Sequence, residues 1–177
     1  MAEPHHVVLT AVGSDRPGIV DEVAAFIAER GGNLEDSRMV NLHGQFAMVL
    51  LVSAAPEAVS RICDDLDDLC ARSRLRAEVH PADMAAPPGR PAVPYRLAVT
   101  AMDHPGLVQA VAHVLHEEGV NIESVDTSLR PAPYTNAPLF EMEMVVSVPA
   151  DAPVARLRER LAGLCDAMNM DWQLTAL

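Results

Sequence analysis

Apolar and polar positions change their period in the same order twice along the chain. In the first copy, the run VVLTAV at residues 7–12 precedes Gly13 and is typical of a buried strand. Pro17 suits the first turn of a helix. One face of that helix is apolar: Ile19, Val23, Phe26 and Ile27. The glycine pair at 31–32 ends it, so the pattern predicts a strand followed by a helix.

The rest of the first copy predicts two strands, a second helix and a last strand. The two strands cover residues 33–42 and 45–53, and His43-Gly44 between them suits a tight turn. Pro56 opens the helix. Its apolar positions recur at helical spacing: Val59, Ile62, Cys63, Leu66, Leu69 and Cys70. A strand at 75–80 completes the predicted order βαββαβ.

The second copy predicts the same order. Its strands and helices are expected at 95–101, 106–118, 120–129, 139–148, 154–168 and 171–176. The two copies also match residue by residue, because DRPGIV at 15–20 returns as DHPGLV at 103–108. The same offset aligns Gly31 with Gly119, Asn33 with Asn121, and Glu35 with Glu123. The chain is therefore predicted to contain an internal repeat.

A proline-rich stretch separates the copies. Residues 81–94, PADMAAPPGRPAVP, contain five prolines, which disfavour helix and sheet. We therefore expect a first domain at residues 5–80, a linker at 81–93 and a second domain at 94–177. Each domain is predicted to have the α+β, ferredoxin-like fold, in which two helices cover one face of an antiparallel sheet.

The two sheets are expected to differ on the face away from the helices. In the strand at 46–52 both alternating sets of side chains are apolar, whereas Glu141 and Glu143 occupy one set of the equivalent strand at 140–146. The first sheet therefore needs a cover on its second face, and small modules bury a modest share of their surface. We expect a homodimer or a larger closed assembly.

Charge and cysteine content narrow the functional classes. The 25 acidic residues outnumber 13 basic residues, all of them arginine, which gives a formal charge of −12. This balance disfavours direct nucleic-acid binding. The longest apolar stretch is too short to cross a membrane, and residues 1–6 lack the features of a signal peptide. Three cysteines without metal-site spacing suit a reducing compartment, so a cytoplasmic protein is expected.

The repeated Asp-x-Pro-Gly segment is a candidate small-molecule site. A helix N-terminus has unpaired N–H groups that attract an anion, and glycine lets a ligand approach the backbone. Asp15 and Asp103 would accept hydrogen bonds from an ammonium group, so each turn offers both halves of an amino-acid zwitterion. Arg16 is permanently charged, whereas His104 gains charge as pH falls. In the alternative interpretation the aspartate only caps the helix.

Other clusters favour structural roles. His113 and His116 lack a third metal ligand at characteristic spacing, and no metal site is predicted. Cys63 and Cys70 lie seven residues apart, which predicts core positions on one helical face. No recognisable catalytic motif is present, and neither an enzyme nor a cofactor is predicted.

DRPGIV and DHPGLV, each followed by G-x-N-I/L-E, resemble the signature of ACT domains, small regulatory modules that bind amino acids. More narrowly, the two copies together with PAPYTNAPLFEMEMVVSVPA resemble the glycine cleavage system transcriptional repressor family. That resemblance implies a protein that senses glycine or another small amino acid and acts by protein contact on a DNA-binding activator. Many ACT sites carry Asn where this chain has Asp15 and Asp103.

The resemblance also implies ligand sites at interfaces between modules, with the strand-opening residues supplied by a neighbouring module. The expected ligand-binding residues are Asp15, Arg16, Pro17, Gly18, Ile19, Val20, Asn33, Leu34, Asp103, His104, Pro105, Gly106, Leu107, Val108, Asn121 and Ile122. An alternative is a regulatory ACT segment related to formyltetrahydrofolate deformylases. The second copy reaches Trp172 and the sequence ends at Leu177, which leaves no length for a hydrolase domain and favours the regulator.

Overall fold

The computed structural model describes residues 4–82, 90–133 and 136–177. The chain divides into two compact units, Met1–Ala86 and Pro87–Leu177, and each is described by itself.

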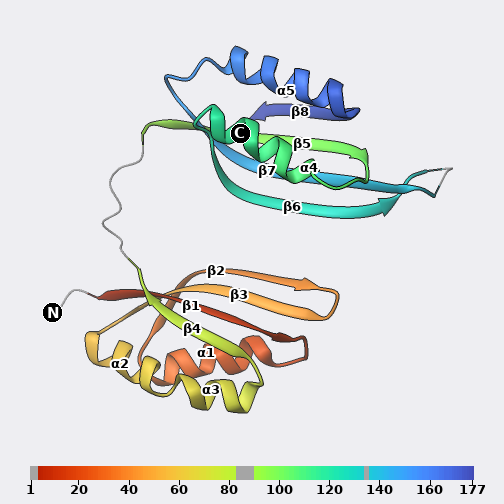
Figure 1. Cartoon of the computed structure of the whole chain (residues 1–177). Helices are drawn as coiled ribbons and strands as arrows, with labels where there is room; N and C mark the ends of the chain where they lie inside the picture. The colour runs from red at the N-terminus through yellow and green to blue at the C-terminus, as the bar shows by residue number, and fades with distance from the viewer. Residues whose placement is uncertain (1–3, 83–89, 134–135) are drawn as a thin grey trace. The chain divides into compact units, whose positions relative to one another are not determined.

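Over residues 4–82, the first module contains four strands and three helices. Along the chain they are β1 (His5–Ser14), α1 (Ile19–Glu29), β2 (Asn33–Leu42), β3 (Gln45–Ala54), α2 (Pro56–Asp64), α3 (Leu66–Ser73) and β4 (Arg76–Pro81). The sheet is antiparallel with strand order β2-β3-β1-β4, so β2 and β4 form its edges (Figure 1).

The second module repeats this plan with one continuous second helix. Its elements are β5 (Ala92–Met102), α4 (Leu107–Glu117), β6 (Asn121–Pro131), β7 (Pro138–Pro149), α5 (Val154–Met168) and β8 (Met170–Ala176). The strand order β6-β7-β5-β8 matches that of the first sheet. The predicted pair of α+β, ferredoxin-like βαββαβ modules is confirmed.

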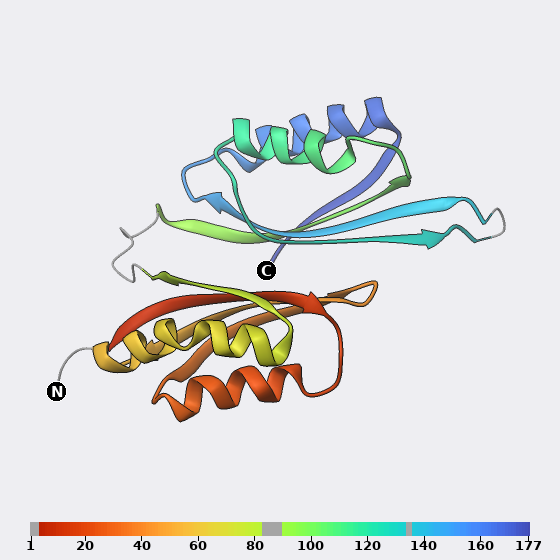
Figure 2. The same ribbon diagram turned by 60° about the horizontal axis from the view of Figure 1, so that its bottom comes forward.

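In each module the helices lie on one face of the sheet, where they enclose the core (Figure 2). In the first module Leu9 and Leu50 point to the helices and are almost completely buried, as are Val23 and Ile27 on α1. The helical face that the sequence predicted for α1 is therefore the buried one. Burial of these apolar side chains is the main source of each module's stability.

A β-bulge interrupts the second strand of both modules at the same place. In β2, Leu34 pairs with Val52 and Asp36 with Leu51, so Glu35 is an extra residue. In β6, Ile122 pairs with Val146 and Ser124 with Val145, so Glu123 is extra. The extra residue shifts the alternation of side chains by one position along the rest of the strand.

Three local predictions need correction. Pro17 is not in the first helical turn, because Gly18 has a φ of 91° and α1 begins only at Ile19. The single helix predicted from Pro56 is divided at Asp65 into α2 and α3. Because the helix breaks between them, Cys63 and Cys70 do not share one buried face.

Strands also occupy both ends of the proline-rich stretch. Pro81 ends β4, while Ala92 and Val93 begin β5. Proline fits at the edge and end of a sheet because it lacks only the N–H donor. The middle of the predicted linker, residues 83–89, lies outside the described residues.

Replacing Gly32 with alanine and replacing Gly163 with alanine are expected to change stability in opposite directions. A Cβ at Gly32 would lie 2.8 Å from Ile27 Cγ2 and 3.1 Å from Val52 Cγ1. Gly32→Ala is therefore expected to destabilise the first module by about 1–3 kcal/mol through overpacking. Gly163 lies in α5 with open space around it, so Gly163→Ala is expected to stabilise the second module by about 0.5–1 kcal/mol.

Urea unfolding of the two variants beside the wild-type chain measures both effects. A Gly32→Ala chain as stable as the wild type would contradict the close packing at the end of α1.

Candidate functional site

The two Asp-x-Pro-Gly turns adopt the same backbone conformation. Each connects the first strand of a module to its first helix, and the glycine immediately precedes that helix. Gly18 has a φ of 91° and Gly106 a φ of 99°, which is a left-handed conformation that side chains with a Cβ rarely adopt. A Cβ at Gly106 would have no atom within 4 Å. The backbone conformation, not crowding, is therefore what requires glycine in these turns.

No side chain caps the N-terminus of α1 or α4. The interpretation in which Asp15 and Asp103 cap these helices is therefore wrong. The first N–H groups of each helix lack partners within it and carry the positive end of the helix dipole. Both turns thus present hydrogen-bond donors that suit an anionic group.

The Asp15 carboxylate is held by a residue that sequence reasoning missed. Asn41, near the end of β2, donates from Nδ2 to Asp15 Oδ2 at 2.5 Å, and its Oδ1 accepts from the N–H of Gly44 at 3.0 Å. The Asp15 N–H also donates to the Gly44 carbonyl at 2.8 Å. These bonds fix the carboxylate beside the hairpin that joins β2 and β3.

In the second module a leucine takes the sheet position of that amide. Asn41 pairs with Phe46 across the first sheet, and the corresponding partner of Phe140 in the second sheet is Leu129. The Asp103 backbone N–H donates to the carbonyl of Pro138 at 3.1 Å, which preserves only the backbone part of the arrangement.

Arg16 is already bound to a carboxylate within its own module. Its Nη1 and Nη2 donate to Glu22 Oε1 and Oε2 at 2.7 and 2.6 Å, and Nη2 also donates to the Ser73 carbonyl at 3.2 Å. The hydrogen bond from Arg16 lowers the pKa of Glu22. An anion at this turn would therefore compete with Glu22 for Arg16, and the role of Arg16 in ligand binding stays a prediction.

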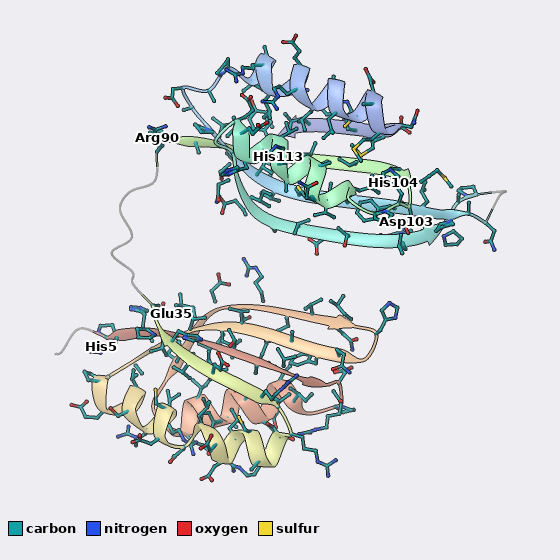
Figure 3. All side chains as sticks on the ribbon, in the orientation of Figure 1. His5, Glu35, Arg90, Asp103, His104 and His113 are labelled. Carbon is teal, nitrogen blue, oxygen red and sulfur yellow. The ribbon has the colours of Figure 1, made fainter. Side chains whose placement is uncertain are left out.

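The second turn has fewer negative charges. His104 takes the place of Arg16 and is exposed, with Nδ1 3.1 Å from the Pro105 carbonyl. Figure 3 labels Asp103 and His104 at the end of β5, where the chain turns toward α4. Asp21 and Glu22 make the first turn of α1 acidic, whereas α4 has no acidic residue there.

A concavity of about 550 Å³ lies at the first turn. Its lining residues are Asp15, Arg16, Gly18, Ile19, Val20, Asp21, Ala24 and Phe46. The Ile19 side chain is buried in the core, as is that of Leu107 in the second module, so each of these residues offers only its backbone to a ligand. Val20 and Val108 are exposed and offer apolar side chains beside the two turns.

The strand-opening residues of the expected site lie at the opposite end of each module. Asn33 pairs with Ser53 and Ser53 with His6, whereas Asp15 follows Ser14 at the other end of β1. Asn121 begins β6, and its Nδ2 donates to Glu123 Oε1 at 2.7 Å. Leu34 and Ile122 follow these asparagines on the same strands. Within one module, therefore, these residues do not meet the Asp-x-Pro-Gly turn.

The cysteines and histidines set aside as structural occupy ordinary environments. Cys63 is exposed, which corrects its predicted place in the core, and Cys70 is half-buried. Burial raises the pKa of the Cys165 thiol to about 11, so this residue stays protonated. His113 Nε2 lies 3.6 Å from Glu117 Oε1, one helical turn away.

The part of the chain that the structure describes holds neither a metal-binding cluster nor a membrane-spanning helix. Residues 4–82, 90–133 and 136–177 contain no group of three or more His, Cys, Asp or Glu residues arranged to hold a metal ion. Over the same residues, no helix has the length and apolar character needed to cross a membrane.

The first module matches a known protein family. The ACT domain family model matches residues 5–80, which include all elements from β1 to β4 except the last residue of β4. The second module has the same strand order and the same Asp-x-Pro-Gly turn. The chain is a tandem ACT-domain protein.

Along most of its length this tandem resembles the glycine cleavage system transcriptional repressor of Escherichia coli strain K12. The two are 27% identical over 169 residues, which cover 96% of this chain and 88% of that protein. A UPF0237 protein of Methanococcus maripaludis is 36% identical over 75 residues, or 42% of this chain and 78% of its own. The crystal structure of an unknown protein from Galdieria sulphuraria has a TM-score of 0.80, with 28% identity and 99% of each chain covered.

The Arg16–Glu22 pair predicts an acid-shifted titration. The pKa of Glu22 lies below its ordinary value of 4.5 because Arg16 binds the ionised form. Its contribution to folding is therefore complete above the unfolded pKa and is lost as pH falls through the folded pKa. Carboxyl NMR titration should give a Glu22 midpoint below 4.5 in the wild type and a higher midpoint in Arg16→Gln.

Glu117 is the matched control. Glu117 lies in the second module, where a hydrogen bond from Arg160 of the same module lowers its pKa. Arg16→Gln should therefore leave the titration of Glu117 unchanged. An unshifted Glu22 in the Arg16→Gln chain would contradict the pairing.

Proposed function

We propose that this chain is a non-catalytic regulator that binds a small amino acid, with glycine as the first candidate. It passes the signal on by contact with a transcription-regulating protein in the cytoplasm. The similarity to the E. coli glycine cleavage system transcriptional repressor covers 96% of the chain, which supports a regulator over a regulatory segment of an enzyme.

The repeated turn is the observation that carries this proposal. Each copy places a left-handed glycine, an uncapped helix N-terminus and an aspartate within four residues of one another. A free amino acid has a carboxylate and an ammonium group separated by one carbon. The helix N–H groups suit the carboxylate, and Asp15 or Asp103 suits the ammonium group.

A small ligand fits the surroundings of these turns. The exposed apolar contacts beside them are Val20 in the first module and Val108 in the second. The polar groups that line the concavity at the first turn are the charged side chains of Asp15, Arg16 and Asp21. Glycine needs only the two charged contacts, so the turn alone can recognise it.

The two turns are proposed to differ in affinity. In the first, Asp21 and Glu22 place negative charge beside the amides that would hold the carboxylate, and Glu22 occupies Arg16. In the second, Gln109 and Ala110 stand at the corresponding positions, and Asp103 lacks the Asn41 amide as a competitor for the ammonium group. The second turn is therefore proposed as the stronger amino-acid site.

A neighbouring module would bring the strand-opening residues to each turn. These residues are Asn33, Leu34, Asn121 and Ile122. They lie at the far end of their own modules, so a turn would meet them only where a different module or another chain approaches it. The proposal therefore includes self-association of the chain, which the uncovered apolar face of the first sheet also supports.

The charge of the chain supports a protein partner instead of nucleic acid. A formal charge of −12 leaves few groups to neutralise phosphates. An amino acid that binds one arrangement of the modules more tightly shifts the protein toward that arrangement and so changes the surface offered to the partner. The partner's effect on amino-acid affinity is then equal to the amino acid's effect on partner affinity.

Removing the aspartate charge is expected to weaken glycine binding. Asp103→Asn is expected to reduce glycine affinity at the second site by roughly tenfold to a hundredfold, the usual range for a lost charge-assisted hydrogen bond. Asp15→Asn should affect the weaker first site. Isothermal titration of glycine into each variant measures the loss.

Asp126→Asn is the matched control, since Asp126 is exposed in the same module and lies opposite Glu143 within the sheet, not at a helix N-terminus. Unchanged glycine affinity in both Asp15→Asn and Asp103→Asn would contradict the proposed site. If the wild-type chain bound another small amino acid and not glycine, only the choice of ligand would be wrong.

The isolated chain is predicted to have little affinity for duplex DNA. Fluorescence anisotropy of a labelled duplex at physiological salt should show weak binding without sequence preference, because electrostatic repulsion opposes the approach of two polyanions. Tight, sequence-selective binding under these conditions would contradict regulation through a protein partner.

A further inference from the structure

The face of the first sheet that points away from its helices has an apolar centre. The two central strands, β1 and β3, present six apolar or small side chains to it: Val8, Thr10, Val12, Ala47, Val49 and Leu51. Val12 is 41% exposed and Val49 48% exposed. No element of the first module, in its described residues, covers this face, so burial against a partner would be favourable.

Charged side chains line the two edges of the same face. On β2 they are Asp36 and Arg38, which pair with each other at 2.7 Å. On β4, Glu78 lies 3.3 Å from His80, and Arg76 completes the edge. All of these side chains are exposed, so a partner can reach them.

The strand pairing arranges the face in three rows that run from β2 to β4. The rows are Asp36–Leu51–Val8–His80, Arg38–Val49–Thr10–Glu78 and Val40–Ala47–Val12–Arg76. In the middle row the two ends have opposite charges, Arg38 and Glu78. In the first row the two ends are the Asp36 carboxylate and the His80 imidazole. The first and middle rows are thus complementary to their own reverse, while the third row places Arg76 over Val40.

We propose that this face pairs with the same face of a second copy about a two-fold axis that runs parallel to the strands. Packed sheets lie about 10 Å apart with their strands nearly aligned, which this axis allows. The rotation places every row on its own reverse. Arg38 then lies over Glu78 of the second copy and Asp36 over His80, while Val49 lies over Thr10 and Ala47 over Val12.

The charges select this axis over the other in-plane two-fold. An axis perpendicular to the strands would place Arg38 on Arg38, Glu78 on Glu78 and Arg76 on His80, and like charges in contact oppose association. The axis parallel to the strands brings opposite charges together at both edges. The pattern of charge therefore specifies how two copies meet.

The repeat itself supports an interface built on the first module. At the positions of Ala47 and Val49, the second sheet carries Glu141 and Glu143. These carboxylates are bound by Arg130 at 3.0 Å and by Arg96 at 3.3 Å on their own face. The open face of the second sheet is thus a polar surface that is stable in water, whereas the open face of the first sheet has an apolar centre.

This inference rests on the self-association in the proposed function and is independent of the amino-acid ligand. The first measurement is sedimentation velocity of the wild-type chain over a range of micromolar concentrations. A concentration-dependent dimer is expected. A monomer throughout would overturn both the self-association and this geometry, and would indicate that another part of the same chain covers the face.

Charge reversal then tests the geometry by itself. Arg38→Glu would oppose two carboxylates across the interface, and Glu78→Arg would oppose two guanidinium groups. Each variant alone is expected to weaken dimerisation by roughly tenfold or more, since each repulsion occurs twice in a symmetric pair. Arg38 and Glu78 are 81% and 75% exposed, so the fold of each variant should be preserved.

An equal mixture of the two variants gives the decisive result. In a mixed pair every reversed charge meets its opposite, so the mixture is expected to regain nearly the dimer affinity of the wild type. Recovery in the mixture, with weak association of each variant alone, would support the proposed axis. A dimer that neither reversal weakens, or a mixture that does not recover, would overturn it.

Val49→Glu tests the apolar centre, and Leu129→Glu is its control. The second module carries Glu143 at the place of Val49, so the fold accepts glutamate there. Leu129 is 61% exposed on an edge strand of the second module and is not one of the residues of the proposed interface. Val49→Glu should abolish the dimer and Leu129→Glu should preserve it. Loss with both variants, or with neither, would overturn the assignment of the face.

Discussion

The structure depends on one constraint, which is that the helices of each module cover only one face of a four-stranded sheet. Each module buries its core between helices and sheet, and the other face must be stable in water or find a partner. The two copies solve this differently. The second sheet carries Glu143 paired with Arg96, whereas the first carries Val49 beside Thr10. Two modules with the same fold therefore have different requirements for their surroundings.

The turns between the first strand and the first helix show a similar division between shared backbone and different side chains. The left-handed glycine and the uncapped helix are common to both. In the first module, Asn41 and Glu22 bind the two charged residues of the turn, Asp15 and Arg16. In the second module those positions hold Leu129 and Ala110, so the charges of its turn face solvent with fewer competitors. The same backbone geometry thus occurs in two different electrostatic environments.

Local signals in the sequence predicted the features that depend on neighbouring residues. The repeat, the order of elements and the His43-Gly44 turn were all predictable, and both residues of that turn have positive φ, at 50° and 81°. Apolar periodicity also predicted the buried face of α1 and the contrast between the two open sheet faces. These features follow from backbone preferences and from solvent exclusion, which short windows of sequence record.

Features that depend on distant contacts were not predictable in the same way. Asn41 reaches Asp15 across 26 positions, and Arg16 reaches the Ser73 carbonyl across 57. No short motif marks either pair. The break at Asp65 was missed because the apolar spacing continues through this residue, which both ends α2 and precedes α3. For the candidate site, therefore, the sequence located the turn but not the side chains that hold its charges.

The bulge in the second strand of each module determines which side chains of that strand reach the open face of the sheet. Glu35 and Glu123 are the extra residues at equivalent places, and both are followed by the same shift in strand pairing. The strand after the bulge presents Asp36, Arg38 and Val40 to the open face in one copy and Ser124, Asp126 and Ser128 in the other. Without the extra residue, the alternation along the strand would turn these side chains toward the helices and place charged groups in each core. The bulge therefore decides which residues of the second strand are accessible to water or to a partner.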